Sequence, residues 1–234
     1  MVDNRTFFSS EGIIQQAPLY LYPDEGKNKP NPGVTMMMVF KPKETYGKKP
    51  NISPIIFEKL EQVFKHRPSP EEILYYIYGV FYSNIYRQTY AEFLKIDFPR
   101  VPFTADYSVF KKMSYLGGEL ADLHLLKSAA LDNPIAKYQG SGTNDRIEKI
   151  TYKEDEQRIY INSDKYFEGA APEVWNYHIG GYQVLQKYLK DRKGRNMDDA
   201  PRYCRIVAAL SKTIEIQEQI DEIYPEVEQE LIQF

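Results

Sequence analysis

A helix-start signal followed by an apolar run restricts the fold of this chain more than any other feature. Ser69-Pro70-Glu71-Glu72 places a capping serine before a proline at the first helical position and a glutamate at the third. Residues 73–82 follow, and they are apolar on nearly every side of a helix. We therefore predict a central buried helix that runs from residue 70 to about residue 94.

Further helices are predicted on both sides of this one. Ser53-Pro54 opens a segment with apolar residues at helical spacing, and an inner stripe of apolar residues recurs every three or four positions between residues 106 and 128. A short helical turn is expected from Pro172. The remaining predicted helices cover residues 182–190 and 198–223.

Strand patterns are shorter and lie at the two ends of this helical region. Alternating apolar residues predict a hairpin whose two arms flank a polar turn at residues 153–157, with Tyr166-Phe167 extending the second arm. We expect Trp175 to be mostly buried against this hairpin. Gly180-Gly181 is expected to be a tight turn between two helices. Near the N-terminus we predict strands at residues 13–22 and 36–40 and an exposed loop at residues 41–50.

These patterns together predict the α+β class, with a helical core and small β-sheet or hairpin elements. A length of 234 residues suits one domain with two lobes. Asn-Pro and Gly-Ser-Gly punctuation between Leu131 and Gly142 places the boundary, so we predict lobes of residues 1–135 and 136–234.

Composition bears on the compartment. A single cysteine, Cys204, can form no internal disulfide, and a reducing environment follows. The N-terminus shows no signal peptide, and no stretch approaches the 18 or so apolar residues of a membrane span. We expect a cytoplasmic protein without a membrane partner.

The charge balance argues against nucleic acid as a partner unless the cations are clustered. The formal net charge is −3, with a pI near 5.8, whereas domains that hold DNA by their own charge usually have excess Lys and Arg. One segment, residues 187–195, places five basic residues against one acidic residue at a helix end. A basic helix end is by itself typical of a solvated surface.

Motifs for catalysis are weak throughout. Pro23-Asp24-Glu25-Gly26-Lys27 mimics a nuclease site, but its carboxylates are adjacent rather than separated, and turn chemistry explains it. Glu119, Asp122 and His124 do not share one helix face. The glycine clusters match no nucleotide-binding pattern. We predict no catalytic residue, no metal site and no cofactor.

Several blocks follow one another along the chain: residues 18–23, 73–78, 86–90, 93–100, 116–126, 174–182 and 189–195. In this order they resemble the C-terminal specificity (target-recognition) region of type ISP and related type IIG single-polypeptide restriction-modification enzymes. The resemblance implies double-stranded DNA as a partner and a parent polypeptide with nuclease, helicase-like ATPase, coupler and adenine-methyltransferase parts. The chain lacks the adenine-holding, S-adenosylmethionine and phosphate-loop motifs of those parts.

The expected function is to read a short DNA sequence through the major groove and so direct methylation and cleavage. Base readers are expected on loops at residues 41–50, 137–146 and 153–157. One alternative is a protein-interaction module that docks by its 20 tyrosines and long C-terminal helix; another is an uncharacterised enzyme. The predicted DNA-contacting residues are Lys187, Lys190, Arg192, Lys193 and Arg195, the last four as phosphate contacts.

Overall fold

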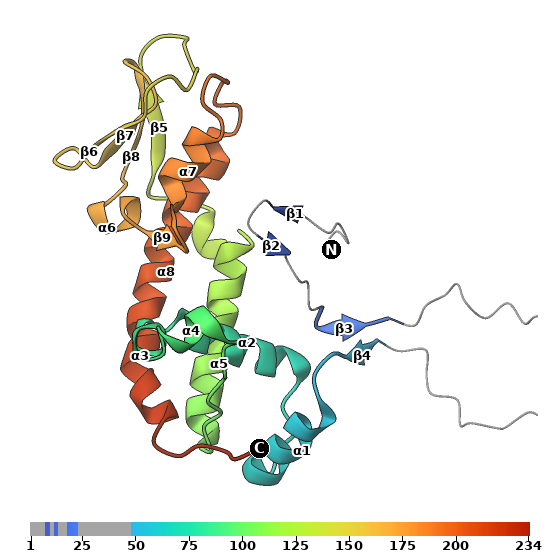
Figure 1. The fold of residues 1–234 in the computed structure, drawn as a ribbon. Coiled ribbons are helices and arrows are strands. Elements are labelled where there is room, and N and C mark those ends of the chain that lie inside the picture. The colour runs from blue at the N-terminus through green and yellow to red at the C-terminus, as the bar shows by residue number, and fades with distance from the viewer. Residues whose placement is uncertain (1–7, 10–11, 14–17, 23–47) are drawn as a thin grey trace, which may run out of the picture. The chain divides into compact units, whose positions relative to one another are not determined.

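The computed structural model describes residues 8–9, 12–13, 18–22 and 48–234 (Figure 1). The chain divides into two compact units, one of residues 1–74 with Phe234 and one of residues 75–233. Three predictions fall wholly or mostly outside the described residues: the turn at 23–27, the strand at 36–40 and the loop at 41–50.

The described residues of the first unit form two short antiparallel strand pairs. The Tyr20 hydroxyl on β3 donates a hydrogen bond to Glu71 Oε1 at 2.6 Å, and this bond raises the pKa of Tyr20 to about 12. The Lys48 ammonium lies 4.0 Å from the Tyr20 ring centroid. The pairs are β1 (Phe8–Ser9) with β2 (Gly12–Ile13) and β3 (Tyr20–Leu21) with β4 (Lys49–Pro50).

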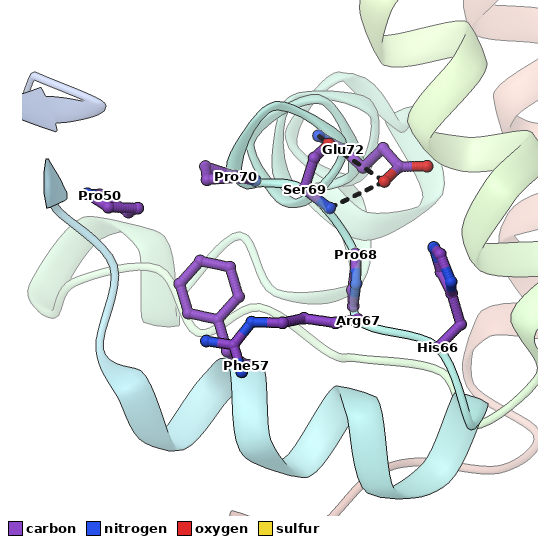
Figure 2. Close-up of a pocket in the computed structure, with 8 residues that line it drawn as sticks. All are labelled: Pro50, Phe57, His66, Arg67, Pro68, Ser69, Pro70 and Glu72. Carbon is purple, nitrogen blue, oxygen red and sulfur yellow. Dashed lines mark hydrogen bonds between the residues drawn. The ribbon is translucent and has the colours of Figure 1, made fainter. Parts of the chain in front are cut away.

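The helix starts predicted at residues 54 and 70 are confirmed. α1 (Pro54–Phe64) has proline in its first turn and ends at Lys65, whose φ of 56° closes the helix. At the start of α2, Ser69 Oγ accepts from Glu72 N at 3.1 Å while Glu72 Oε2 accepts from Ser69 N at 2.8 Å (Figure 2). This reciprocal capping satisfies backbone donors that an uncapped helix would leave unpaired.

The predicted single helix to residue 94 is wrong, because the chain breaks after Tyr82. Ser83 is extended, with ψ of 127°, and its hydroxyl accepts from Tyr86 N at 3.1 Å. The Asp221 carboxylate then accepts from Ser83 Oγ at 2.7 Å and from Ile85 N at 3.2 Å. A side chain distant in sequence thus stabilises the break. The three helices are α2 (Pro70–Tyr82), α3 (Asn84–Thr89) and α4 (Phe93–Ile96).

Within the second unit, α2 and α5 approach so closely that glycine is required on both. A Cβ built on Gly117 would lie 1.9 Å from the Tyr75 carbonyl oxygen, and one built on Gly79 would lie 2.8 Å from the Met113 carbonyl oxygen. Real Cβ atoms do not approach that closely, so the two backbones pack directly against each other. α5 comprises Tyr107–His124.

Two long helices form the centre of the second unit. α5 begins after Asp106, whose carboxylate accepts from Ser108 N at 2.7 Å. It ends short of the predicted residue 128, and Leu126 has a φ of 55° that no α-helix continues. α8 (Ala200–Val227) lies side by side with α5 (Figure 1). The predicted inner stripe of α5 is buried at Val109, Phe110, Met113, Leu116, Leu120 and Leu123.

An antiparallel sheet of order β5-β8-β7-β6 packs at one end of α8 (Figure 1). The predicted hairpin arms are confirmed as β6 and β7, but Tyr166-Phe167 does not extend β7. The Asn162 side-chain oxygen accepts from the backbone N–H groups of Asp164 and Lys165, and this turn returns the chain as a third strand. The strands are β5 (Lys137–Gly140), β6 (Thr151–Lys153), β7 (Arg158–Tyr160) and β8 (Lys165–Glu168).

The segment after the sheet fixes Trp175 as predicted. Its side chain is 8% exposed and stacks on Tyr152 of β6, with ring centroids 4.9 Å apart. Gly180-Gly181 connects β9 to β10 rather than two helices, and Gly180 has the positive φ of 59° that such a turn requires. The elements of this segment are α6 (Pro172–Trp175), β9 (His178–Ile179), β10 (Tyr182–Gln183) and α7 (Val184–Lys190); a short 3-10 helix, η1 (Ala129–Leu131), precedes the sheet.

The predicted α+β class is confirmed: helices form most of the core, and the sheets are small and antiparallel. One buried cluster joins the four-stranded sheet, α6, α7 and the first turns of α8, between Ala136 and Leu210. The predicted lobes of residues 1–135 and 136–234 stay a prediction.

Candidate nucleic-acid interface

The basic segment, residues 187–195, is anchored by the inner side of α7. Leu185 and Leu189 are fully buried in the cluster beneath the sheet. The polar residues between and after them therefore lie on the outer side of the helix and in the loop that follows. This places cations at the C-terminal end of α7, where the helix dipole favours positive charge.

Two of the five predicted contact residues already have partners within the chain. Lys187 Nζ lies 2.5 Å from Asp191 Oδ1, and this hydrogen bond raises the pKa of Lys187. The Arg192 guanidinium stacks 3.6 Å from the Tyr188 ring centroid and donates to the Tyr188 carbonyl oxygen at 3.0 Å. Both side chains thus stabilise the conformation of the segment by contacts within it.

The other three, Lys190, Lys193 and Arg195, are exposed. Among the described residues, no carboxylate forms an ion pair with any of them. The one acidic residue of the segment, Asp191, is occupied by Lys187. Three cations therefore remain available on one short surface.

Backbone hydrogen bonds attach a second loop, residues 141–150 between β5 and β6, to this segment. Ile147 N donates to the Arg195 carbonyl at 2.9 Å, and Gly194 N donates to the Ile147 carbonyl at 2.7 Å. Met197 N donates to the Asp145 carbonyl at 2.8 Å. Both loops emerge at the same end of the second unit, in yellow and orange in Figure 1.

This pairing adds a cation that sequence reasoning did not single out. Arg146 is exposed, and its Nη2 lies 3.9 Å from where a Cβ on Gly194 would stand. Within the part of the chain that the structure describes, its guanidinium has no ion pair. Arg146 falls in the predicted loop range 137–146, but nothing local in the sequence distinguishes it from other exposed arginines.

The predicted base-reading turn at residues 153–157 differs in its electrostatics. Glu156 accepts hydrogen bonds from Lys153, Arg158 and the Tyr160 hydroxyl at 2.8, 3.1 and 2.6 Å. The bonds from Lys153 and Tyr160 lower the pKa of this carboxyl to about 2. Cations and carboxylate therefore neutralise one another on this outer side of the sheet. Of the other two predicted loops, residues 137–140 form the edge strand β5, and residues 41–47 lie outside the described range.

An apolar surface lies at the other end of α8, around a cavity of about 510 Å³. Phe93, Ile96 and Phe98 line it and are 66%, 81% and 81% exposed. The two charged residues that line it, Arg100 and Asp97, pair with each other at 3.7 Å. Single exposed apolar residues are common on protein surfaces, whereas several that adjoin one another are typical of an interaction site.

The first unit has a cavity of about 480 Å³ beside the start of α2 (Figure 2). Pro50, Phe57 and Pro68 contribute apolar walls, and the Arg67 guanidinium lies 4.9 Å from the Phe57 ring centroid. Arg67 also pairs with Glu61 at 2.9 Å. The polar groups are thus used in capping and pairing, and the cavity assembles no set for catalysis.

Across the described residues, no group of three or more His, Cys, Asp or Glu side chains could hold a metal ion. His124, weighed above with Glu119 and Asp122, instead bonds to Tyr78 and Thr213. The described helices also include none with the length and apolar character needed to cross a bilayer.

Comparison with known proteins assigns the family. No curated protein matches the sequence. The protein-family model of the type ISP C-terminal specificity domain matches residues 1–219 of the sequence. The chain belongs to this family. The resemblance drawn from its sequence blocks is thereby confirmed.

Solved structures share the fold of this specificity domain. The type ISP enzyme LlaBIII bound to DNA matches 92% of the chain at 22% identity and a TM-score of 0.56. A nuclease-deletion mutant of the type ISP enzyme LlaGI, in complex with a DNA substrate mimic, matches 74% at 21% identity and 0.54. A DrdV–DNA complex matches 88% at 19% identity and 0.61. The specificity domain spans only 14–21% of the length of those chains.

Proposed function

We propose that this chain reads a short sequence of double-stranded DNA through the major groove, as the recognition part of a single-polypeptide restriction-modification enzyme. The observation that carries the proposal is the group of three unpaired cations, Lys190, Lys193 and Arg195, on a domain of the specificity family. Cations without carboxylate partners suit phosphates, which position a protein on a duplex without specifying sequence.

The five predicted residues divide by their surroundings. Lys190, Lys193 and Arg195 are the phosphate contacts, because their charge is free. Lys187 and Arg192 support that surface, since Asp191 and Tyr188 already engage them. The proposal therefore makes Lys187 a matched control for the three contact residues, being a cation of the same segment.

The experiment compares duplex binding by the wild-type chain, the triple variant Lys190→Ala, Lys193→Ala, Arg195→Ala, and the single variant Lys187→Ala. We expect the triple variant to bind every duplex sequence more weakly and with a salt slope shallower by about three units, one per lost contact. Lys187→Ala removes no phosphate contact, so it should lower the affinity only through the Asp191 carboxylate that it leaves unpaired, and by less than the triple variant does. Equal slopes for the triple variant and the wild type would remove this segment from the interface.

We further propose that the chain only recognises DNA, and that cleavage, ATP hydrolysis and methyl transfer belong to other parts of a longer polypeptide. Because the proposed partner is double-stranded DNA, we also propose a cytoplasmic location. The chain spans 14–21% of the matched enzymes, which leaves ample length for such parts. Turnover by the purified chain, supplied with plasmid, Mg²⁺, ATP and S-adenosylmethionine, would contradict this division.

A second candidate function, protein docking, rests on the apolar surface of Phe93, Ile96 and Phe98. We propose that the remainder of the parent polypeptide covers this surface, because this chain spans only 14% of the matched LlaBIII chain. The two functions differ in their response to salt, because burial of apolar surface is little screened by ions. Docking would be supported if the chain binds the remainder of the polypeptide at high salt and Phe98→Asp abolishes this binding. If Phe98→Asp leaves the binding unchanged, this surface is not the docking site.

A further inference from the structure

Two asparagine side chains hold the backbone of Arg146. Its N–H donates to Asn144 Oδ1 at 3.0 Å, and its carbonyl accepts from Asn162 Nδ2 at 2.9 Å. It also forms an antiparallel bridge with Asn196 of the loop after α7. Next to it, Ile147 is fully buried in the core.

The Asn162 side chain fixes this arrangement from below. It is 6% exposed, and its amide donates to the carbonyls of both Asn144 and Arg146. Its oxygen accepts from the N–H groups of Asp164 and Lys165. An asparagine amide offers two donors and two acceptor sites, and all four are used. The loop that presents Arg146 is therefore rigid at its base.

The neighbouring acidic groups do not neutralise the guanidinium. Asp145 accepts from the Tyr138 hydroxyl at 2.7 Å and lies 3.9 Å from Lys165 Nζ. Glu148 accepts from the Asn144 amide at 3.2 Å. A charged, planar donor is thus held on a fixed backbone beside Gly194, with its head exposed.

We propose that Arg146 is a specificity-determining residue, which reads the O6 and N7 edge of one guanine in the major groove; this rests on the proposed DNA-reading function. The guanidinium fork matches those two acceptors in a bidentate geometry, which a lysine ammonium cannot reproduce. Rigid backbone support fixes the point from which the side chain extends, which limits the base positions that the fork can reach. Lys190 and Lys193, on flexible stems, hold the adjacent phosphates.

The experiment selects bound duplexes from a pool with a random central segment, using the wild-type chain, Arg146→Ala, Arg146→Lys and the control Lys193→Ala. The wild type should enrich a sequence that contains an essential G·C pair. Arg146→Ala should lose the preference at that pair and weaken binding to the enriched duplex by roughly 5- to 150-fold. Arg146→Lys should restore charge without restoring preference. Lys193→Ala should weaken all duplexes equally and keep the preference.

The outcomes separate this inference from the function on which it rests. If Arg146→Ala weakens all duplexes equally, or enriches the same sequence as the wild type, Arg146 is not a base reader, and the DNA-reading function stands. If the wild type binds duplexes without any preference, the inference fails and only phosphate binding remains. If the wild type binds no duplex, both fail.

Discussion

His124 joins three helices of the second unit through hydrogen bonds that define its tautomer. Thr213 Oγ1 donates to the Ala209 carbonyl at 2.7 Å, so it must accept from His124 Nε2–H at 3.0 Å. His124 Nδ1 then carries the lone pair that accepts from the Tyr78 hydroxyl at 2.7 Å. A second proton on the ring would break this last bond, so the site is built for a neutral histidine.

Burial lowers the pKa of His124 below its ordinary value of 6.5, and the sign of the pH effect follows. Between the two pKa values the unfolded chain binds more protons than the folded one, so stability falls as pH falls. We expect the melting temperature to be unaffected by His124 above pH 6.5 and to decrease below it. In His124→Gln this part of the pH dependence should disappear, whereas the exposed control His178→Gln should retain it. Identical profiles for both variants would contradict the assignment.

At the scale of elements, the sequence predicted features that depend on neighbouring residues, and it missed features that depend on contacts between residues distant in the chain. The starts of α1 and α2 are confirmed because the prolines, and at α2 also Ser69 and Glu72, act within one turn. The break after Tyr82 was missed because its stabilising partner, Asp221, lies on α8. For the same reason the basic segment was visible in sequence, whereas its pairing with the loop of Arg146 depends on Gly194 and Ile147 meeting across the fold.

The contact between α2 and α5 gives an element-scale prediction with a matched control. Gly117→Ala forces a Cβ against the Tyr75 carbonyl, and overpacking of this kind costs about 1–3 kcal/mol. Gly118→Ala instead meets the Tyr75 ring at 3.4 Å and gains helix propensity of about 1 kcal/mol. Thermal melts should therefore show Gly117→Ala below the wild type and Gly118→Ala at or above it. Equal melting temperatures for the two variants would mean that the helices do not touch there.

At the scale of the whole molecule, the charge balance constrains how the domain can hold DNA. The chain has 30 basic and 33 acidic residues, and its net charge of −3 repels phosphates at long range. Many described cations are also paired, as Lys153 and Arg158 are with Glu156. Short-range attraction is therefore expected where unpaired cations lie close together, as Lys190, Lys193 and Arg195 do on one segment without a described carboxylate partner.

A limited set of phosphate contacts predicts a shallow salt dependence for the isolated chain. Each phosphate contact releases counterions and contributes about −0.9 to the slope of log K against log salt, so three contacts give about −2.7. Affinity should then fall roughly 40-fold between 50 and 200 mM salt, far less than for DNA-binding proteins that make many such contacts. Titration of a labelled duplex at several salt concentrations measures this directly. A slope steeper than about −6 would require a second phosphate-binding surface elsewhere on the chain, and a slope near zero would favour the docking function instead.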